Sequence, residues 1–162
     1  MDFDRLEKLP LARIKVRALV KYGDSYLFIQ RQKHGKRKKY LTFPGGRLKK
    51  SDRDENDKHN LGLTLRNALV RELEEELGAR EIVIGPVLST LNKHKHDTEV
   101  LFSVDVGSYD WDSRTGKEFT NPNKGAYQLV VLEELNIVEL GKNELALKPK
   151  KWRKTICSLS HN

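Results

Sequence analysis

Residues 64–78 read TLRNALVRELEEELG, and this stretch decides how the rest of the chain is interpreted. Leucines recur at every fourth position with Ala68 beside them, which is the apolar stripe of an amphipathic helix. Thr64 can cap the start of such a helix, and Gly78 can end it. The pattern therefore predicts a helix over 64–77 whose apolar side packs on a core.

The C-terminal half of this helix carries a dense run of acids. Residues three and four apart share a helix face, so Glu72, Glu75 and Glu76 lie within an arc of about 100°. Carboxylates crowded in this way repel one another, and a hard divalent cation such as Mg²⁺ removes the conflict. The alternative is a solvated helix face on which Arg71 pairs with Glu74 or Glu75.

The segments around the helix predict a single mixed α/β domain over residues 1–162. Alternation over 13–21 predicts a strand with one apolar face and one wet face. The polar stretch 49–60 and the Gly- and Pro-containing stretch 110–124 predict loops. Further strands are predicted over 26–30, 41–43, 81–87, 99–106 and 127–132, and a closing helix over 150–159.

Composition restricts the class of protein. No apolar run approaches the roughly 20 residues of a membrane span, and residues 1–10 lack the apolar core of a signal peptide. With a single cysteine, Cys157, the chain fits a cytoplasmic protein. The net charge is +8, with lysines concentrated in 33–39 and 148–154. These stretches favour a polyphosphate or nucleic-acid partner, or they only keep the surface soluble.

A glycine-rich turn upstream extends the pattern. Pro44-Gly45-Gly46 follows a predicted strand, where glycines let the backbone approach a ligand or metal. Here the chain resembles the Nudix hydrolase family, whose box runs Gly, five residues, Glu, seven residues, Arg-Glu, an aliphatic residue, any residue, Glu-Glu, any residue, Gly. The residues that match are Gly46, Arg71, Glu72, Leu73, Glu75, Glu76 and Gly78.

The chain departs from the box in two respects. Seven residues separate Leu63 from Arg71, so Leu63 stands where the family has glutamate, and sixteen residues, 47–62, separate it from Gly46. We interpret the extra residues as an insertion in the loop, and we expect the loss of the glutamate at position 63 to weaken the support of Arg71. An acid of the stretch 52–57 can compensate, although a solvated loop is the favoured interpretation.

The resemblance implies a Nudix-type α/β/α sandwich, with a mixed β-sheet flanked by helices. It also implies cleavage of the diphosphate linkage of a nucleoside diphosphate derivative or nucleoside triphosphate by metal-activated water. Glu72, Glu75 and Glu76 are the implied ligands of Mg²⁺, with Mn²⁺ as an alternative, and Arg71 is implied to orient them. The proton of water goes to one of these acids or to a loop carboxylate, of which Glu118 is preferred to Glu99.

Phosphates require cationic partners, so we expect Arg17, Arg31 and Arg47 to bind substrate together with Gly45 and Gly46. Tyr40, Tyr127 or Trp111 can stack a base, and the sequence does not choose among them. His94 and His96 alternate on a predicted strand, but nothing completes a transition-metal site around them.

The alternative function is a catalytically weakened Nudix-fold module that binds nucleotide or RNA, suggested by Leu63 and the basic stretches. RNA is less favoured than a small nucleotide, and no membrane partner is expected. A homodimer is compatible with the family, in which dimers are common.

Overall fold

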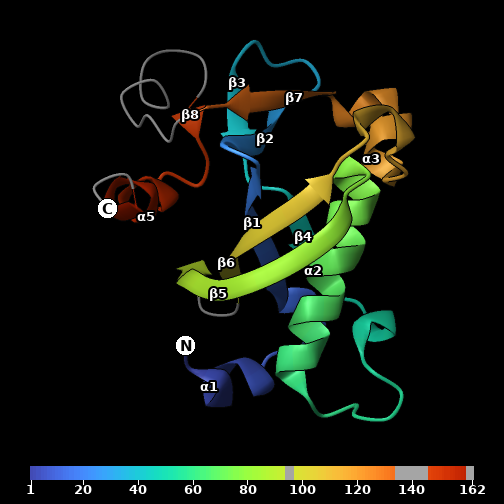
Figure 1. Cartoon of the computed structure of the whole chain (residues 1–162), viewed down its shortest axis with the longest axis vertical. Helices are drawn as coiled ribbons and strands as arrows, with labels where there is room; N and C mark the ends of the chain where they lie inside the picture. The colour runs from blue at the N-terminus through green and yellow to red at the C-terminus, as the bar shows by residue number, and fades with distance from the viewer. Residues whose placement is uncertain (94–96, 134–145, 160–162) are drawn as a thin grey trace.

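A mixed β-sheet held between helices forms the centre of the chain, whose computed structural model describes residues 1–93, 97–133 and 146–159 (Figure 1). The strands are β1 (Ile14–Tyr22), β2 (Ser25–Gln32), β3 (Lys39–Thr42), β4 (Gly45–Arg47), β5 (Arg80–Lys93), β6 (Asp97–Ser108), β7 (Ala126–Leu132) and β8 (Ala146–Leu147). The α-helices are α1 (Phe3–Glu7), α2 (Leu61–Leu77), α3 (Lys117–Thr120) and α5 (Trp152–Leu159). Short 3₁₀ turns are η1 (Leu11–Arg13), η2 (Lys50–Asp52), η3 (Trp111–Ser113) and η4 (Pro122–Lys124).

The described strands join in the order β5-β6-β1-β2-β3-β8, with β4 paired to β1 and β7 to β2. Two pairs, β1 with β6 and β3 with β8, are parallel, and the other pairs are antiparallel. Strand β2 pairs with β1 through its first residues and with β3 through its last. The sheet therefore branches beside β4, and this branch is where the candidate site lies.

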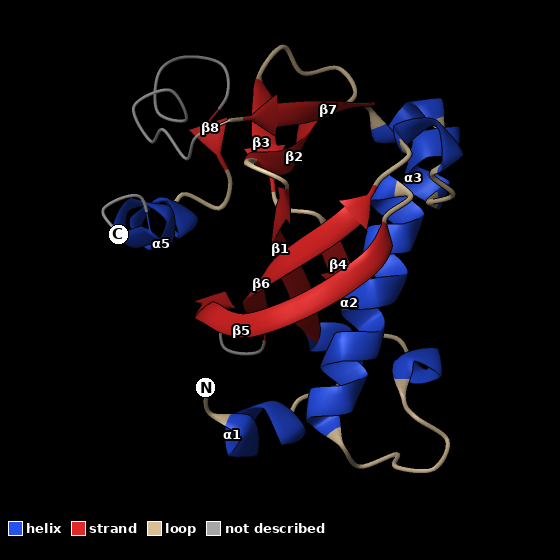
Figure 2. Cartoon of the chain, viewed as in Figure 1, coloured by secondary structure: helices blue, strands red, loops and turns tan. Residues whose placement is uncertain are grey.

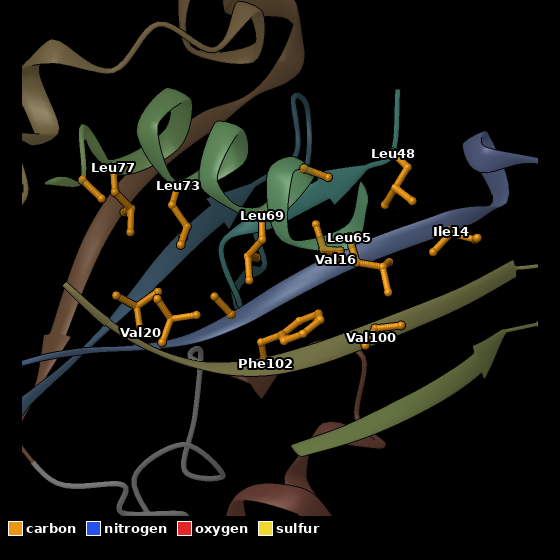
Figure 3. Packing of buried hydrophobic residues seen from close by; sticks show 14 of the residues in the cluster. Ile14, Val16, Val20, Leu48, Leu65, Leu69, Leu73, Leu77, Val100 and Phe102 are labelled. Atoms are coloured by element: carbon orange, nitrogen blue, oxygen red, sulfur yellow. The ribbon is translucent and has the colours of Figure 1, made fainter. Parts of the chain in front are cut away.

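Helices cover the sheet on both sides (Figure 2). The leucine stripe of α2 packs on one face against alternate residues of β1 and β6, including Val16, Val20 and Phe102 (Figure 3). On the other face, Leu19 and Leu101 pack with Trp152 and other side chains that include Ile156 of α5. This arrangement confirms the predicted α/β/α sandwich. It also shows that the second face of β1, predicted to be wet, is partly core.

The ends of α2 show one error and one success of the sequence analysis. The helix begins at Leu61, and its cap is Asn60, whose side chain accepts a hydrogen bond from the amide of Leu63 at 2.9 Å. Thr64, the predicted cap, lies inside the helix with its hydroxyl donating to the Asn60 carbonyl. Gly78 does end the helix, in the left-handed conformation at φ 59° that favours glycine.

Neither predicted loop is structureless. The stretch 49–60 contains η2, and 110–124 contains η3, α3 and η4. Within the described ranges, no helix has the length and apolar character needed to cross a bilayer.

Candidate active site

A cleft of about 710 Å³ opens at the branch of the sheet. Its walls hold Gly45 and Gly46 of β4, Glu76 of α2 and Glu118 of α3. Strand β4 lies here because Gly45 pairs with Arg17 in the β1–β4 ladder. Nine cationic side chains and two carboxylates line the cleft, so it is strongly suited to anions. All five residues expected to bind substrate, including Arg31 and Arg47, line this cleft.

Glu76 lies at the junction of α2 and β4. Its Oε2 accepts a hydrogen bond from the backbone amide of Gly45 at 2.7 Å. Burial raises the pKa of Glu76 to about 8, and the negative charges of Glu72 and Glu118 add to that shift, while the Gly45 amide and Arg17 oppose it. A positive ion would relieve this cost of ionisation.

Glu72 is buried one turn earlier on α2, beneath Gly46. A Cβ at position 46 would lie 2.6 Å from the carboxyl carbon of Glu72, so a larger residue there would push this carboxylate aside. Burial raises the pKa of Glu72, although Arg71, whose guanidinium donates to Oε1 at 2.7 Å, opposes that shift. The backbone of β4 is thus packed directly on two of the three glutamates.

Glu75 is half-buried and lies between two cations. Arg71 donates to its Oε2 at 3.4 Å, and Lys49 Nζ lies 3.9 Å from its Oε1. Among the described Asp, Glu, His and Cys side chains, no three already stand as a metal cage. The donor set is nevertheless all oxygen, on one side of one helix, with raised pKa values at Glu72 and Glu76. These residues fit a hard divalent cation.

Arg71 is held by an acid that the sequence analysis undervalued. Its Nε and NH2 donate to the two carboxylate oxygens of Asp52 at 2.7 and 3.0 Å, and its NH2 also donates to the Arg47 carbonyl. Asp52 is only 4% exposed, so the solvated-loop interpretation is wrong for this residue. The signal was present, because Asp52 follows Gly46 after five residues, the spacing of the first acid in the box. The insertion therefore lies after Asp52, and Leu63 is not the counterpart of that acid.

Arg17 faces the cleft but is not free to move. It donates to Glu99 Oε1 at 3.2 Å and to the carbonyls of Phe43 and Gly45. Glu99 also lies 3.0 Å from Lys93 Nζ and 3.9 Å from Lys15 Nζ. Burial works against ionisation of Glu99, yet these cations hold its pKa below the ordinary value. Glu99 thus organises three cations in the wall of the cleft.

Glu118 is carried by a segment that also closes the end of α2. The amides of Thr115 and Gly116 both donate to the Glu75 carbonyl, at 2.9 and 3.3 Å. Arg114 lies between the rings of Trp111 and Phe119, at 3.9 and 4.7 Å from their centroids. This packing fixes the segment beside the carboxylates. It also removes Trp111 from the base-stacking candidates.

The other two candidates for stacking a base, Tyr40 and Tyr127, both line the cleft. The lysines of the cleft were missed as binding residues: Lys15, Lys33, Lys93, Lys124, Lys148 and Lys150. Two of them, Lys33 and Lys148, open the basic stretches noted in the sequence. The parallel pairing of β3 with β8 brings these two stretches together. This pairing joins segments far apart in the chain, so no local sequence pattern could predict it. His94, His96 and His161 lie outside the described residues.

The fold and site together define a class of protein: an α/β/α sandwich that carries a glutamate-rich helix beside a cationic cleft. The sequence profile of the NUDIX domain matches residues 12–151, so the chain belongs to the Nudix family. No curated protein sequence matches the chain significantly.

Solved structures share the fold at low sequence identity. A NUDIX hydrolase from Nitrosomonas europaea superposes with a TM-score of 0.60 at 16% identity, covering 91% of this chain and 88% of that one. An ADP-ribose pyrophosphatase from Streptococcus suis 89-1591 gives 0.56 at 17% identity, covering 93% of each chain. The MutT protein from Methanosarcina mazei Go1 gives 0.53 at 16%, covering 95% and 96%.

Proposed function

We propose that the chain is a metal-dependent pyrophosphohydrolase that cleaves the diphosphate linkage of a nucleoside diphosphate derivative or nucleoside triphosphate. One observation carries this proposal: the carboxylate of Glu76 lies in a cleft whose other charged side chains are nine cations and Glu118, with Glu72 packed under the same glycines. Carboxylates on one side of a cleft and cationic side chains on the others can hold a metal ion and a phosphate chain next to each other.

Glu72, Glu75 and Glu76 would hold Mg²⁺ or Mn²⁺. The bound ion supplies positive charge against the phosphoryl oxygens and makes water more acidic. Arg71, locked by Asp52, keeps the carboxylates of Glu72 and Glu75 oriented.

The chain's own residues bind and orient the substrate. Arg17 is fixed by Glu99 and Gly45, so it can present its charge to a phosphate without losing side-chain entropy. Water attacks one phosphorus, a new P–O bond forms, and the bridging P–O bond breaks to release a phosphate-terminated product. Glu118, which faces the cleft near Glu76, would accept the proton of the attacking water.

The binding-module alternative loses part of its basis. It was suggested by Leu63, but Arg71 is supported by Asp52 whatever stands at position 63. The basic stretches fit an enzyme cleft as well as an RNA surface, since residues from both line the cleft.

The test is a comparison of three matched variants along α2. Glu75→Gln and Glu76→Gln should lower kcat/KM by roughly a hundredfold or more, because each removes a charge needed only when the site is loaded. Glu74→Gln, on the exposed side of the same helix, should leave activity unchanged.

Activity would be read as phosphate after phosphatase coupling, with Mg²⁺ or Mn²⁺. The substrates would be nucleoside triphosphates, dinucleoside polyphosphates, nucleotide sugars and ADP-ribose. Full activity of both Glu75→Gln and Glu76→Gln would contradict the site assignment, and turnover of no substrate by the unaltered chain would contradict the function.

A further inference from the structure

Apart from Arg47, the cations of the cleft fall into two groups. Lys15, Arg17 and Lys93 all lie within 4 Å of Glu99, so much of their charge is balanced by the protein itself. The other group, here called the outer cations, consists of Arg31, Lys33, Lys124, Lys148 and Lys150. None of the five forms a salt bridge with a carboxylate in residues 1–93, 97–133 or 146–159. Their charge is therefore available to a ligand.

Strand pairing places part of this group in one row. Arg31 of β2 lies directly opposite Tyr40 of β3 on one side and Tyr127 of β7 on the other, and directly opposite residues share a face of the sheet. The Arg31 guanidinium lies 5.2 Å from the centre of the Tyr127 ring, and Lys148 Nζ lies 4.9 Å from that of Tyr40. Two of the outer cations, Arg31 and Lys148, therefore make cation–π contacts with tyrosine rings.

Arg31 also carries a donor that is still unused. Its Nε is buried, and within the described part of the structure it makes no hydrogen bond. Buried donors of this kind normally have an acceptor, so a ligand oxygen is the natural partner. Lys33 comes directly after β2, which ends at Gln32, and it lines the same cleft as Arg31.

The size of this uncompensated charge discriminates between substrate classes. A diphosphate esterified at both ends carries about two negative charges, and Arg47 together with a bound divalent ion suffices to match it. Five further cations confined to one cleft repel one another, and the additional phosphates of a longer chain would offset that repulsion.

On the basis of the proposed function, we propose that this cleft selects substrates whose diphosphate linkage belongs to a chain of three or more phosphates. Diphosphates esterified at both ends are the disfavoured class. The outer cations bind the phosphates beyond the linkage that is cut.

The first test is calorimetric binding to the full chain without metal, which separates binding from turnover. The probes are ADP-ribose, ATP and adenosine 5′-tetraphosphate at pH 7, over a range of KCl concentrations. We expect ATP to bind at least tenfold more tightly than ADP-ribose, and the tetraphosphate more tightly again. The dependence of log K on log[KCl] should also be steeper for the longer chains. ADP-ribose affinity equal to or above that of ATP would overturn the proposal.

The second test uses two double variants that remove the same net charge. Lys148→Gln/Lys150→Gln should weaken ATP binding about tenfold and ADP-ribose binding less than twofold. The control, Lys8→Gln/Lys21→Gln, alters exposed lysines that do not line the cleft and should change neither. Equal losses in both double variants, or equal losses for both ligands, would contradict a local role of the outer cations.

Failure of this inference can be told apart from failure of the proposed function. Tight triphosphate binding without turnover of any substrate in Mg²⁺ or Mn²⁺ removes the enzymatic function but leaves the selectivity. Turnover together with equal binding of ADP-ribose and ATP removes the selectivity but leaves the enzyme.

Discussion

Asp52 shows how one buried acid, placed just before an insertion, can support the arginine of the glutamate-rich helix. It pairs with two nitrogens of Arg71 and accepts a hydrogen bond from the Lys49 amide at 2.7 Å, all while buried. A loop of this composition would otherwise remain solvated. This ion pair, together with the Asn67 side chain that donates to the Asp52 carbonyl, joins η2 to α2, and residues 53–60 connect the two elements.

Removal of the Asp52 charge should weaken both the fold and the metal site. We expect Asp52→Asn to lower the free energy of unfolding by about 2 kcal/mol, because it leaves a largely buried guanidinium without its main partner. Mg²⁺ affinity should fall roughly tenfold, since Arg71 then pulls more strongly on Glu72 and Glu75. Urea unfolding and Mg²⁺ titration measure the two effects. Glu55→Gln, exposed in the same loop, is the control, and matching losses in both variants would refute the specific role.

Glu76 should make the stability of the metal-free protein depend on pH. Its pKa is about 8 in the folded chain against an ordinary 4.5, so the folded state binds more protons between these values. The free energy of unfolding should therefore fall as the pH rises from about 5 to 8, by up to about 4 kcal/mol. Glu76→Gln should flatten this slope, and Mg²⁺ should stabilise the unaltered chain more at pH 8 than at pH 6. The measurement is thermal unfolding of both proteins across this pH range. If the stability of Glu76→Gln falls with pH in parallel with that of the unaltered chain, the prediction is wrong.

At the scale of elements, the C-terminus of α2 is the point on which the site is assembled. The helix ends with the Gly78 amide donating to Glu74 and the Ala79 amide to Leu73, and further amides from the 110–116 segment bind its last carbonyls. The sequence predicted the helix and its terminal glycine, because both leave a local pattern. It could not predict that amides of the 110–116 segment also cap the helix. Backbone hydrogen bonds between residues some 40 positions apart leave no pattern of side chains in the sequence.

Gly78→Ala should cost more than the backbone conformation alone explains. Position 78 is left-handed, and a Cβ there would clash with the Asp110 carbonyl and lie 2.6 Å from Ser113 Oγ. We expect a loss of about 2–3 kcal/mol in urea unfolding, of which about 1 kcal/mol is left-handed strain. Gly35→Ala supplies the comparison, because Gly35 has φ +70° and open space around it and should lose only the strain. If the two variants lose the same stability, the packing of 110–116 on α2 is not what position 78 protects.

At the scale of the whole molecule, the two faces of the sheet contribute different parts of the candidate site. The α2 face holds the predicted core and carries the glutamates, and alternation in β1 together with the leucine stripe was enough to predict it. The α5 face holds the second core and lies next to Lys148 and Lys150, which line the same cleft as Arg31 of β2. That half of the cleft was not predictable, because it depends on one short parallel pairing between segments about 100 residues apart.

This division predicts that cavities in the two cores affect binding differently. Ile156 of α5 and Leu65 of α2 are both fully buried, and replacing either with alanine should cost about 2–4 kcal/mol of stability. Only Ile156→Ala loosens the packing of α5 next to Lys148 and Lys150, so it alone should weaken ATP binding, by about threefold or more. The measurement is ATP calorimetry at a temperature where both variants remain folded, checked by circular dichroism. Equal weakening by both variants would mean that lost stability, and not the placement of the outer cations, governs affinity.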